Sequence, residues 1–234
     1  MVLTPAEIEA LQLSLRVAFW SVLFSLPLAI AAALVLARFE FPGKSLLDAL
    51  LHLPLVLPPV VIGYLLLLLF GRRGPLGAIL EEYFGIVVAF RWTGAALAAA
   101  VMGFPLMVRA IRLSLEAIDR NLEAAAATLG ANHAWIFATI TLPLALPGII
   151  AGVLLSFARG LGEFGATITF VSNIPGETQT LPLAIYTFTQ VPGGDDQAMR
   201  LCIVSALLSV AALFVSEVLA TRANLRLRGH EPPR

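Results

Sequence analysis

The chain contains long runs of apolar residues, each close to the length needed to cross a lipid bilayer. A membrane-spanning helix needs about 20 mainly apolar residues, because the hydrocarbon core is about 30 Å thick. The runs of this kind lie at residues 12–37, 47–70, 88–108, 140–165 and 200–221. The sequence therefore predicts an all-α integral membrane protein with about five transmembrane helices, which form a single membrane domain over residues 1–234.

The distribution of basic residues predicts how these spans are oriented, since loops rich in Lys and Arg stay in the cytoplasm. With five spans, the loops at 38–46 and 109–139 lie on the same side as the C-terminal tail. The basic residues on this side are Arg38, Lys44, Arg109, Arg112, Arg120, Arg222, Arg226, Arg228 and Arg234, whereas the other side has Arg72, Arg73, Arg91 and Arg200. We therefore expect a multi-pass membrane protein with its N-terminus outside and its C-terminus in the cytoplasm.

The chain lacks the residue patterns of an enzyme or a metal protein. Its formal net charge is zero, so no attraction to nucleic acid is expected. Cys202 is the single cysteine, and the histidines His52, His133 and His230 are scattered without matching acids. We expect no catalytic residue, no metal site and no cofactor bound by this chain, and we interpret His52 as a packed, hydrogen-bonded residue.

One segment resembles a phosphate-binding loop only in part. Residues 38–45, "RFEFPGKS", end like the pattern G-x-x-x-x-G-K-[ST], but Arg38 stands where the first glycine is needed. Pro42 also removes a backbone N–H group that such a loop requires. Nucleotide binding is not expected here, and Lys44 is interpreted as a cytoplasmic anchor of the span.

Prolines are concentrated in the second span, in the segment "PLVLPP" at residues 54–59. Freed backbone groups are costly in lipid unless protein or a watery cavity satisfies them. Interrupted helices often line a substrate path. Pro58 and Pro59 are therefore pore or gate candidates, although prolines are also common as simple kinks in membrane helices.

The segment "SFARGLGEFGA", residues 156–166, carries two ionisable residues near the outer part of the fourth span. Arg159 and Glu163 are four residues apart and would share one face of a helix. They could line the pore or the outer gate, with Gly160, Gly162 and Gly165 allowing close packing across the pore. The alternative, which we favour for Glu163, is an ion pair that stabilises the span, because ionisable groups within a span are costly and are usually paired.

Residues 123–148, "EAAAATLGANHAWIFATITLPLALPG", interrupt the succession of spans on the cytoplasmic side. The alanine-rich part favours a helix that ends before Gly130, where a left-handed backbone is expected. Asn132 can then cap a second short helix over residues 133–140, and Pro143 lies at the entry to the next span. The pattern predicts a helix–turn–helix at the membrane surface, which either receives a partner or packs only on its own chain.

The same stretch resembles the "EAA" signature of type I ABC importer permeases: EAA, three residues, Gly, nine residues, Ile-x-Leu-Pro. Gly130, Ile140, Leu142 and Pro143 match the second half. In the first half Glu123 lies one position early, Ala124 occupies the usual glutamate position, and Ala125 and Ala126 match. The segments "FPGK", "LHLPLVLPPVVIGYLLL", "FPLMVRAIR" and "FARGLGEFGATITFVSNIPGETQTLPLAIYTF" are similar to the molybdate permease branch, over about residues 8–220.

The resemblance implies a type I ABC importer permease fold and a molybdate, and also tungstate, import function. It implies a homodimeric pore in the lipid of the bacterial cytoplasmic membrane, with the N-terminus in the periplasm. It also implies two ABC ATPase subunits that hold ATP and Mg, and a periplasmic molybdate-binding protein. The coupling loop at 109–143 would contact the ATPase through the matched residues, Glu123 included. The alternatives are a permease for another oxyanion such as sulfate, or an ion-coupled transporter without an ATPase, with a membrane enzyme as a weaker third.

The loop at residues 171–199 lies on the side predicted to face the periplasm. Leu181 to Phe188 is too short to span the membrane and is expected to form a short surface helix. We hypothesise that this loop meets the binding protein, with an ordinary solvated connector as the alternative.

Overall fold

A computed structural model describes residues 3–228, without the side chains at 213, 216, 217 and 219–228. No strand occurs in the described part, which confirms the all-α prediction. The elements, in chain order, are α1 (Pro5–Arg38), α2 (Lys44–Val56), α3 (Pro59–Phe70), α4 (Pro75–Phe84), α5 (Trp92–Glu116), α6 (Arg120–Thr128), α7 (His133–Ile136), the π-helix η1 (Phe137–Thr141), α8 (Leu142–Leu161), α9 (Gly165–Val171), α10 (Leu181–Thr189) and α11 (Asp195–Arg228).

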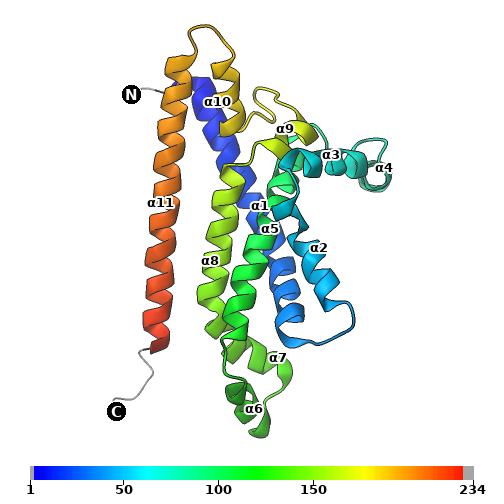
Figure 1. Cartoon of the computed structure of the whole chain (residues 1–234), viewed down its shortest axis with the longest axis vertical. Helices are drawn as coiled ribbons and strands as arrows, with labels where there is room; N and C mark the ends of the chain where they lie inside the picture. Colours follow the sequence, from blue (N-terminus) through cyan, green and yellow to red (C-terminus); the bar gives the residue numbers. More distant parts are fainter. Residues whose placement is uncertain (1–2, 229–234) are drawn as a thin grey trace.

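Three helical segments of the described residues are long and apolar enough to cross a membrane: Pro5–Arg38, Trp92–Glu116 and His133–Leu161. A fourth candidate is the pair α2 and α3, which together fill the predicted span at 47–70 but are bent by 112° at their junction. The predicted fifth span falls within α11, which runs beside α8 (Figure 1). Some side chains of α11 are not described, and residues 229–234 lie outside the described part. The basic tail residues whose side chains are therefore not described are Arg222, Arg226, Arg228 and Arg234.

Helices α1, α5 and α8 form the centre of the molecule, and small residues allow them to approach closely. A Cβ atom added at Gly103 or Gly148 would collide with Ser156 or Ser114 on the facing helix. Because apolar side chains gain little from leaving lipid, membrane helices associate through such close packing. The buried core accordingly contains many alanines, among them Ala18, Ala29, Ala95, Ala98 and Ala99.

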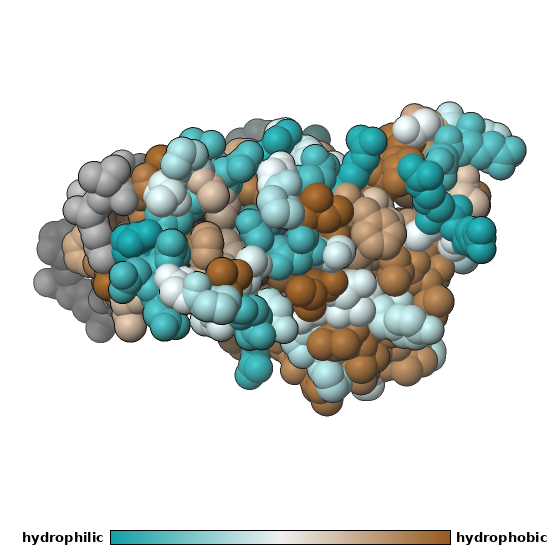
Figure 2. Space-filling view, turned by 90° about the horizontal axis from the view of Figure 1, so that it is seen from above, coloured by the Kyte–Doolittle hydropathy of each residue, from teal (hydrophilic) through white to brown (hydrophobic). Residues whose placement is uncertain are grey.

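The two ends of the bundle are built differently (Figure 1). One end carries α6 and α7, which extend beyond the ends of α5 and α8. The other end carries α10 and the start of α11, and α3, α4 and α9 lie to one side near it. Viewed from that second end, hydrophilic residues spread over much of the end face beside hydrophobic ones (Figure 2).

The start of α1 is fixed by bonds to its own backbone and to α11. Thr4 caps the helix, and its backbone N–H donates to Glu7 Oε2 at 2.6 Å. Glu7 is fully buried, and its Oε1 atom lies 2.9 Å from Nη2 of Arg200 in the first turns of α11. A buried carboxylate requires such a partner, and the pair holds the two chain-terminal helices together at this end.

Candidate functional site

The predicted helix–turn–helix is present at the end of the bundle that carries α6 and α7. Helix α6 ends at Thr128, and Gly130 has a φ of +88°, in the left-handed region that favours glycine. Asn132 caps α7, because its side chain accepts a hydrogen bond of 2.8 Å from the backbone N–H of Trp135. The glycine break and the asparagine cap were both predicted from the sequence, and both are confirmed.

The second half of the signature passes into the next span without a break, so the short helix predicted over residues 133–140 is not separate from that span. A π-helical turn, η1, joins α7 to α8, and the backbone N–H of Leu142 donates to the carbonyl of Phe137. Pro143 lies in the first turn of α8 and has no N–H to donate. A wider π turn accommodates this missing bond, so Ile140, Leu142 and Pro143 belong to one continuous helical segment, His133–Leu161.

The turn between α6 and α7 presents apolar side chains to solvent. Leu129 is 88% exposed and Trp135 is 57% exposed. They line a shallow surface hollow together with Ala126, Gly130, Ala131 and Asn132. Exposed apolar groups at the tip of a molecule, rimmed by polar ones, are typical of a protein contact surface.

Glu123 faces its own chain. Its Oε1 atom accepts hydrogen bonds from Nη2 of Arg38 at 2.8 Å and from Oγ1 of Thr141 at 2.6 Å. Ala124 and Ala125 are exposed, whereas Ala126 is buried. Sequence reasoning placed all four residues in the ATPase contact, but it could not foresee that the glutamate would have two partners within the chain, one of them 85 residues away along the sequence.

The proline and glycine candidates come together near the other end of the bundle. The second span breaks at Leu57 and Pro58, and Pro59 begins α3. A Cβ added at Gly165, the first residue of α9, would lie 2.8 Å from the Cβ of Pro59. One added at Gly63 would lie 2.5 Å from the carbonyl oxygen of Ala166. Helices α3 and α9 therefore pack at a separation that only glycine permits.

Arg159 and Glu163, the ionisable residues of this region, form an ion pair that is buried on the glutamate side. Nη1 of Arg159 lies 2.6 Å from Oε2 of Glu163, whose side chain is 2% exposed. The prediction that both residues share a helix face is wrong, because α8 ends at Leu161. Glu163 lies in the corner after the helix, where its Oε1 atom accepts a hydrogen bond of 2.8 Å from the N–H of Ala166 at the start of α9. This arrangement supports the ion-pair interpretation.

Gly162 does not pack closely within the chain. A Cβ added there would meet only the carbonyl oxygen of Ala158, at 3.9 Å. A Cβ added at Gly160 would meet Ala99 and Ser21 at 3.5 Å, which is ordinary contact. Within the described part of the chain, Gly165 alone of the three glycines therefore packs closely. Close packing across a pore involves a second copy of the chain and stays a prediction.

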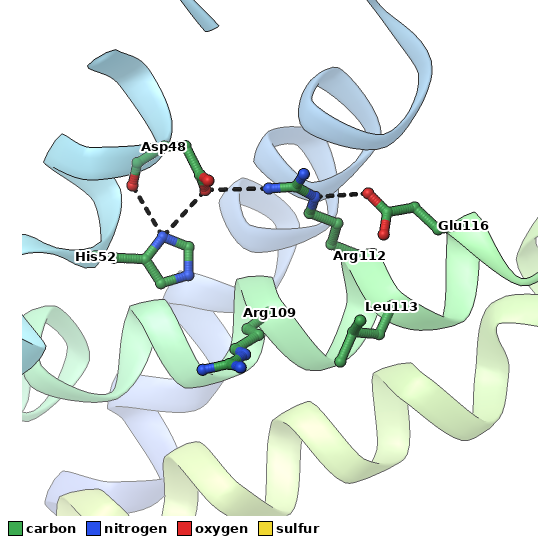
Figure 3. Close-up of a pocket in the computed structure, with 6 residues that line it drawn as sticks. All are labelled: Asp48, His52, Arg109, Arg112, Leu113 and Glu116. Atoms are coloured by element: carbon green, nitrogen blue, oxygen red, sulfur yellow. Dashed lines mark hydrogen bonds and ion pairs between the residues drawn. The ribbon is translucent and has the colours of Figure 1, made fainter. Parts of the chain in front are cut away.

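A polar cluster between α2 and α5 was not identified from the sequence (Figure 3). Nη1 of Arg112 lies 3.1 Å from Oδ1 of Asp48, and its Nε atom lies 2.7 Å from Oε1 of Glu116. Nδ1 of His52 lies 2.9 Å from the backbone oxygen of Asp48, as expected for a packed, hydrogen-bonded histidine. Arg109 lines the same hollow. The four-residue spacing of Asp48 and His52, and of Arg112 and Glu116, was the available signal.

The loop at 171–199 contains the predicted short helix, α10. Side-chain hydrogen bonds order the segment before it: Nδ2 of Asn173 donates to Oγ1 of Thr187 at 2.7 Å, and Nε2 of Gln179 donates to Oδ1 of Asn173 at 3.1 Å. Leu181, Leu183 and Ala184 are buried, so α10 is packed against the bundle rather than lying free on its surface. Contact of this loop with a binding protein stays a prediction.

Comparison with known proteins relates the whole chain to transport proteins. The model of the family described as binding-protein-dependent transport system inner membrane component matches residues 25–229. The molybdenum transport system permease protein ModB of Escherichia coli K12 is 63% identical over 220 residues, covering 94% of this chain and 96% of that protein. ModB of Haemophilus influenzae is 60% identical over 221 residues, covering 94% and 96%.

A solved structure shares the fold. A bacterial ABC transporter involved in the import of the acidic polysaccharide alginate superposes with a TM-score of 0.74, covering 94% of this chain and 80% of that one. At 17% identity this similarity shows the fold alone. Together, these matches show that the chain belongs to the family of binding-protein-dependent transport system inner membrane components.

Proposed function

We propose that the chain is the permease subunit of a bacterial ABC importer for molybdate, and also for tungstate. The observation that carries this proposal is the 63% identity to a molybdenum transport permease over 94% of the chain. The family model matches residues 25–229, a range that includes the coupling loop and the outer corner. Two copies of the chain form the pore, and a periplasmic binding protein delivers the oxyanion.

The turn between α6 and α7 is the proposed contact with the ATPase. Leu129 and Trp135 are exposed there and have no function in the core of this chain. Two ATPase subunits, which hold ATP and Mg, dock on this surface of the dimer and push α6 and α7 as they close. The transmembrane chain does not hydrolyse ATP itself and converts the push into a rearrangement of its spans.

The corner formed by α3, α8 and α9 is the proposed outer gate. Pro58 and Pro59 set the break in the second span, and Gly165 and Glu163 hold α9 against it. In the proposed orientation the N-terminus and α10 face the periplasm and α6 faces the cytoplasm. This assignment is supported by the basic residues Arg38, Arg112 and Arg120, which lie at the end that carries α6.

The proposal is tested by purifying the chain with a candidate ATPase and binding protein and reconstituting the complex in lipid vesicles. Molybdate-loaded binding protein should stimulate ATP hydrolysis and oxyanion uptake, whereas sulfate should stimulate neither. Stimulation by sulfate and not by molybdate would favour a sulfate permease. Uptake without any ATPase would favour an ion-coupled transporter.

A matched pair of variants tests the docking surface. Trp135→Ala removes an exposed aromatic side chain, and an aromatic residue at the centre of an interface is typically worth about 2 kcal/mol or more of binding free energy. We expect ATPase co-purification to fall while the chain still inserts and folds. Tyr83→Ala, which removes another exposed aromatic group from α4, should leave co-purification unchanged.

A further inference from the structure

One carboxylate oxygen joins three separate elements at the end of the bundle that carries α6. Glu123 lies in α6, and its Oε1 atom accepts from Arg38 at 2.8 Å and from Thr141 at 2.6 Å. Arg38 is the last residue of α1, and Thr141 is the last residue before α8. The contacts therefore connect the coupling helix to the ends of the first and fourth spans.

Helix α6 has little else to hold it in place. Ala126 is its single buried residue, so apolar packing fixes it weakly. A second polar contact, from Nη2 of Arg120 to the backbone oxygen of Ala37, is longer at 3.4 Å and also leads to the end of α1. With so small an apolar contact, the bonds of Glu123 are the main link between α6 and the two spans.

The link is sheltered from water. The side chains of Arg38 and Glu123 are only 16% and 23% exposed. Salt screens partly buried charge pairs much less than exposed ones, and hydrogen bonds between ionised groups are about twice as strong as neutral ones. The contacts of Glu123 are therefore strong enough to carry a displacement of α6 to the ends of α1 and α8.

The early position of the glutamate in the sequence has a geometric explanation. Neighbouring residues of an α-helix are separated by about 100° around the axis. Ala124, which occupies the usual glutamate position, is exposed. A carboxylate one residue earlier is turned toward Arg38 and Thr141 instead of toward solvent, where a partner protein would approach.

From this geometry we propose that Glu123 is a positioning residue, which fixes α6 to the ends of α1 and α8 so that the three move as one body. This inference rests on the proposed function, because it assumes that an ATPase displaces α6. The ATPase contact is then made by the exposed turn at Leu129 and Trp135. Without the link, the same displacement is absorbed by rotation of α6 and does not reach the spans.

The functional test measures the number of molybdate ions taken up per ATP hydrolysed by the reconstituted complex. We expect Glu123→Gln and Arg38→Gln each to lower this ratio by roughly tenfold while hydrolysis continues, the size expected for weakening one charge-assisted hydrogen bond. The double variant should be no worse than either single variant, because both remove the same link. Arg38→Lys, which keeps the charge, should retain most of the coupling.

The matched control is Glu40→Gln, which removes the carboxylate of an exposed pair with Lys44 at 2.7 Å near the same end of the bundle. This variant should leave the ratio unchanged. An unchanged ratio in Glu123→Gln would overturn the proposal. Loss of ATPase co-purification in that variant would also overturn it, because it would assign Glu123 to the partner contact.

A second measurement needs no partner. Hydrogen exchange of the backbone amides of α6, recorded on the purified chain in detergent, should become roughly tenfold faster in Glu123→Gln. Exchange as slow as in the wild type would overturn the proposal whatever the transport result. Faster exchange would support the link even if molybdate failed to stimulate the wild-type complex, and in that case the proposed function alone would fail.

Discussion

The proposed coupling end, which carries α6, and the proposed outer gate, formed by α3, α8 and α9, are both built around a carboxylate paired with an arginine. The two pairs lie in different surroundings. Glu163 is 2% exposed, and Gly165 beside it packs against Pro59 without space for a Cβ. Glu123 is 23% exposed, in a helix with one buried residue. The outer corner is thus rigid by packing, whereas the coupling helix is held mainly by a few polar bonds. Attachment by a few polar bonds suits the displacement by an ATPase that is proposed for α6.

Removing the buried carboxylate of the outer corner should have the largest effect on stability. Glu163→Ala leaves Arg159 without its partner and the N–H of Ala166 without an acceptor. We expect the free energy of unfolding to fall by about 3 kcal/mol, the lower end of the range for a broken buried pair, since Arg159 is partly exposed. Thermal unfolding in detergent measures this.

Glu163→Gln serves as the control for that change, because an amide oxygen can still accept from Ala166. It should be less destabilising than the alanine variant. If the alanine variant were as stable as the wild type, the ion pair of Arg159 and Glu163 would not stabilise this corner.

The packing of α9 on α3 can be tested with two glycines three residues apart. Gly165→Ala places a Cβ 2.8 Å from that of Pro59, and such overpacking typically costs about 1–3 kcal/mol of folding free energy. Gly162→Ala places a Cβ 3.9 Å from the carbonyl oxygen of Ala158, an ordinary contact, and should cost little. Equal unfolding midpoints for the two variants would show that α3 and α9 do not pack this closely.

The coupling loop should respond differently to a change of its own glycine. No atom lies within 4 Å of a Cβ added at Gly130, but the φ of +88° disfavours a branched residue. Gly130→Val should cost about 1–2 kcal/mol locally, with normal insertion but with hydrolysis uncoupled from uptake. Gly130→Asn, a residue that tolerates this conformation, should retain more uptake. Equal uptake by the valine variant and the wild type would contradict the role of this turn in docking.

The smallest effect is expected at the polar cluster of α2 and α5. Glu116 is 41% exposed and pairs with Arg112 one helical turn away. Pairs of this type contribute about 0.3–0.5 kcal/mol, so Glu116→Gln should barely change the unfolding midpoint. Asp48→Asn, which weakens the bridge from Arg112 to the other helix, should cost more. The reverse order would mean that the cluster does not join α2 to α5.

Much of the fold follows from residue type and spacing. Apolar runs long enough for a bilayer predict helices, since only an internally bonded backbone is stable in lipid. Gly130 and Asn132 mark local backbone states that few other residues favour, so the turn could be predicted. The proline cluster at residues 54–59 marked the second span as interrupted, and the sharp bend lies at Pro58, whereas Pro54 continues the helix before it.

Sequence by itself determined the class of the protein, its apolar spans and the chemistry of its coupling loop, because these depend on local composition and on short spacings. Tertiary structure alone decided which partners the charged groups meet. Arg38 and Glu123 are 85 positions apart, and Glu7 and Arg200 are 193 apart. No local pattern encodes such pairs, since they arise only when close packing of small residues brings the ends of separate helices together.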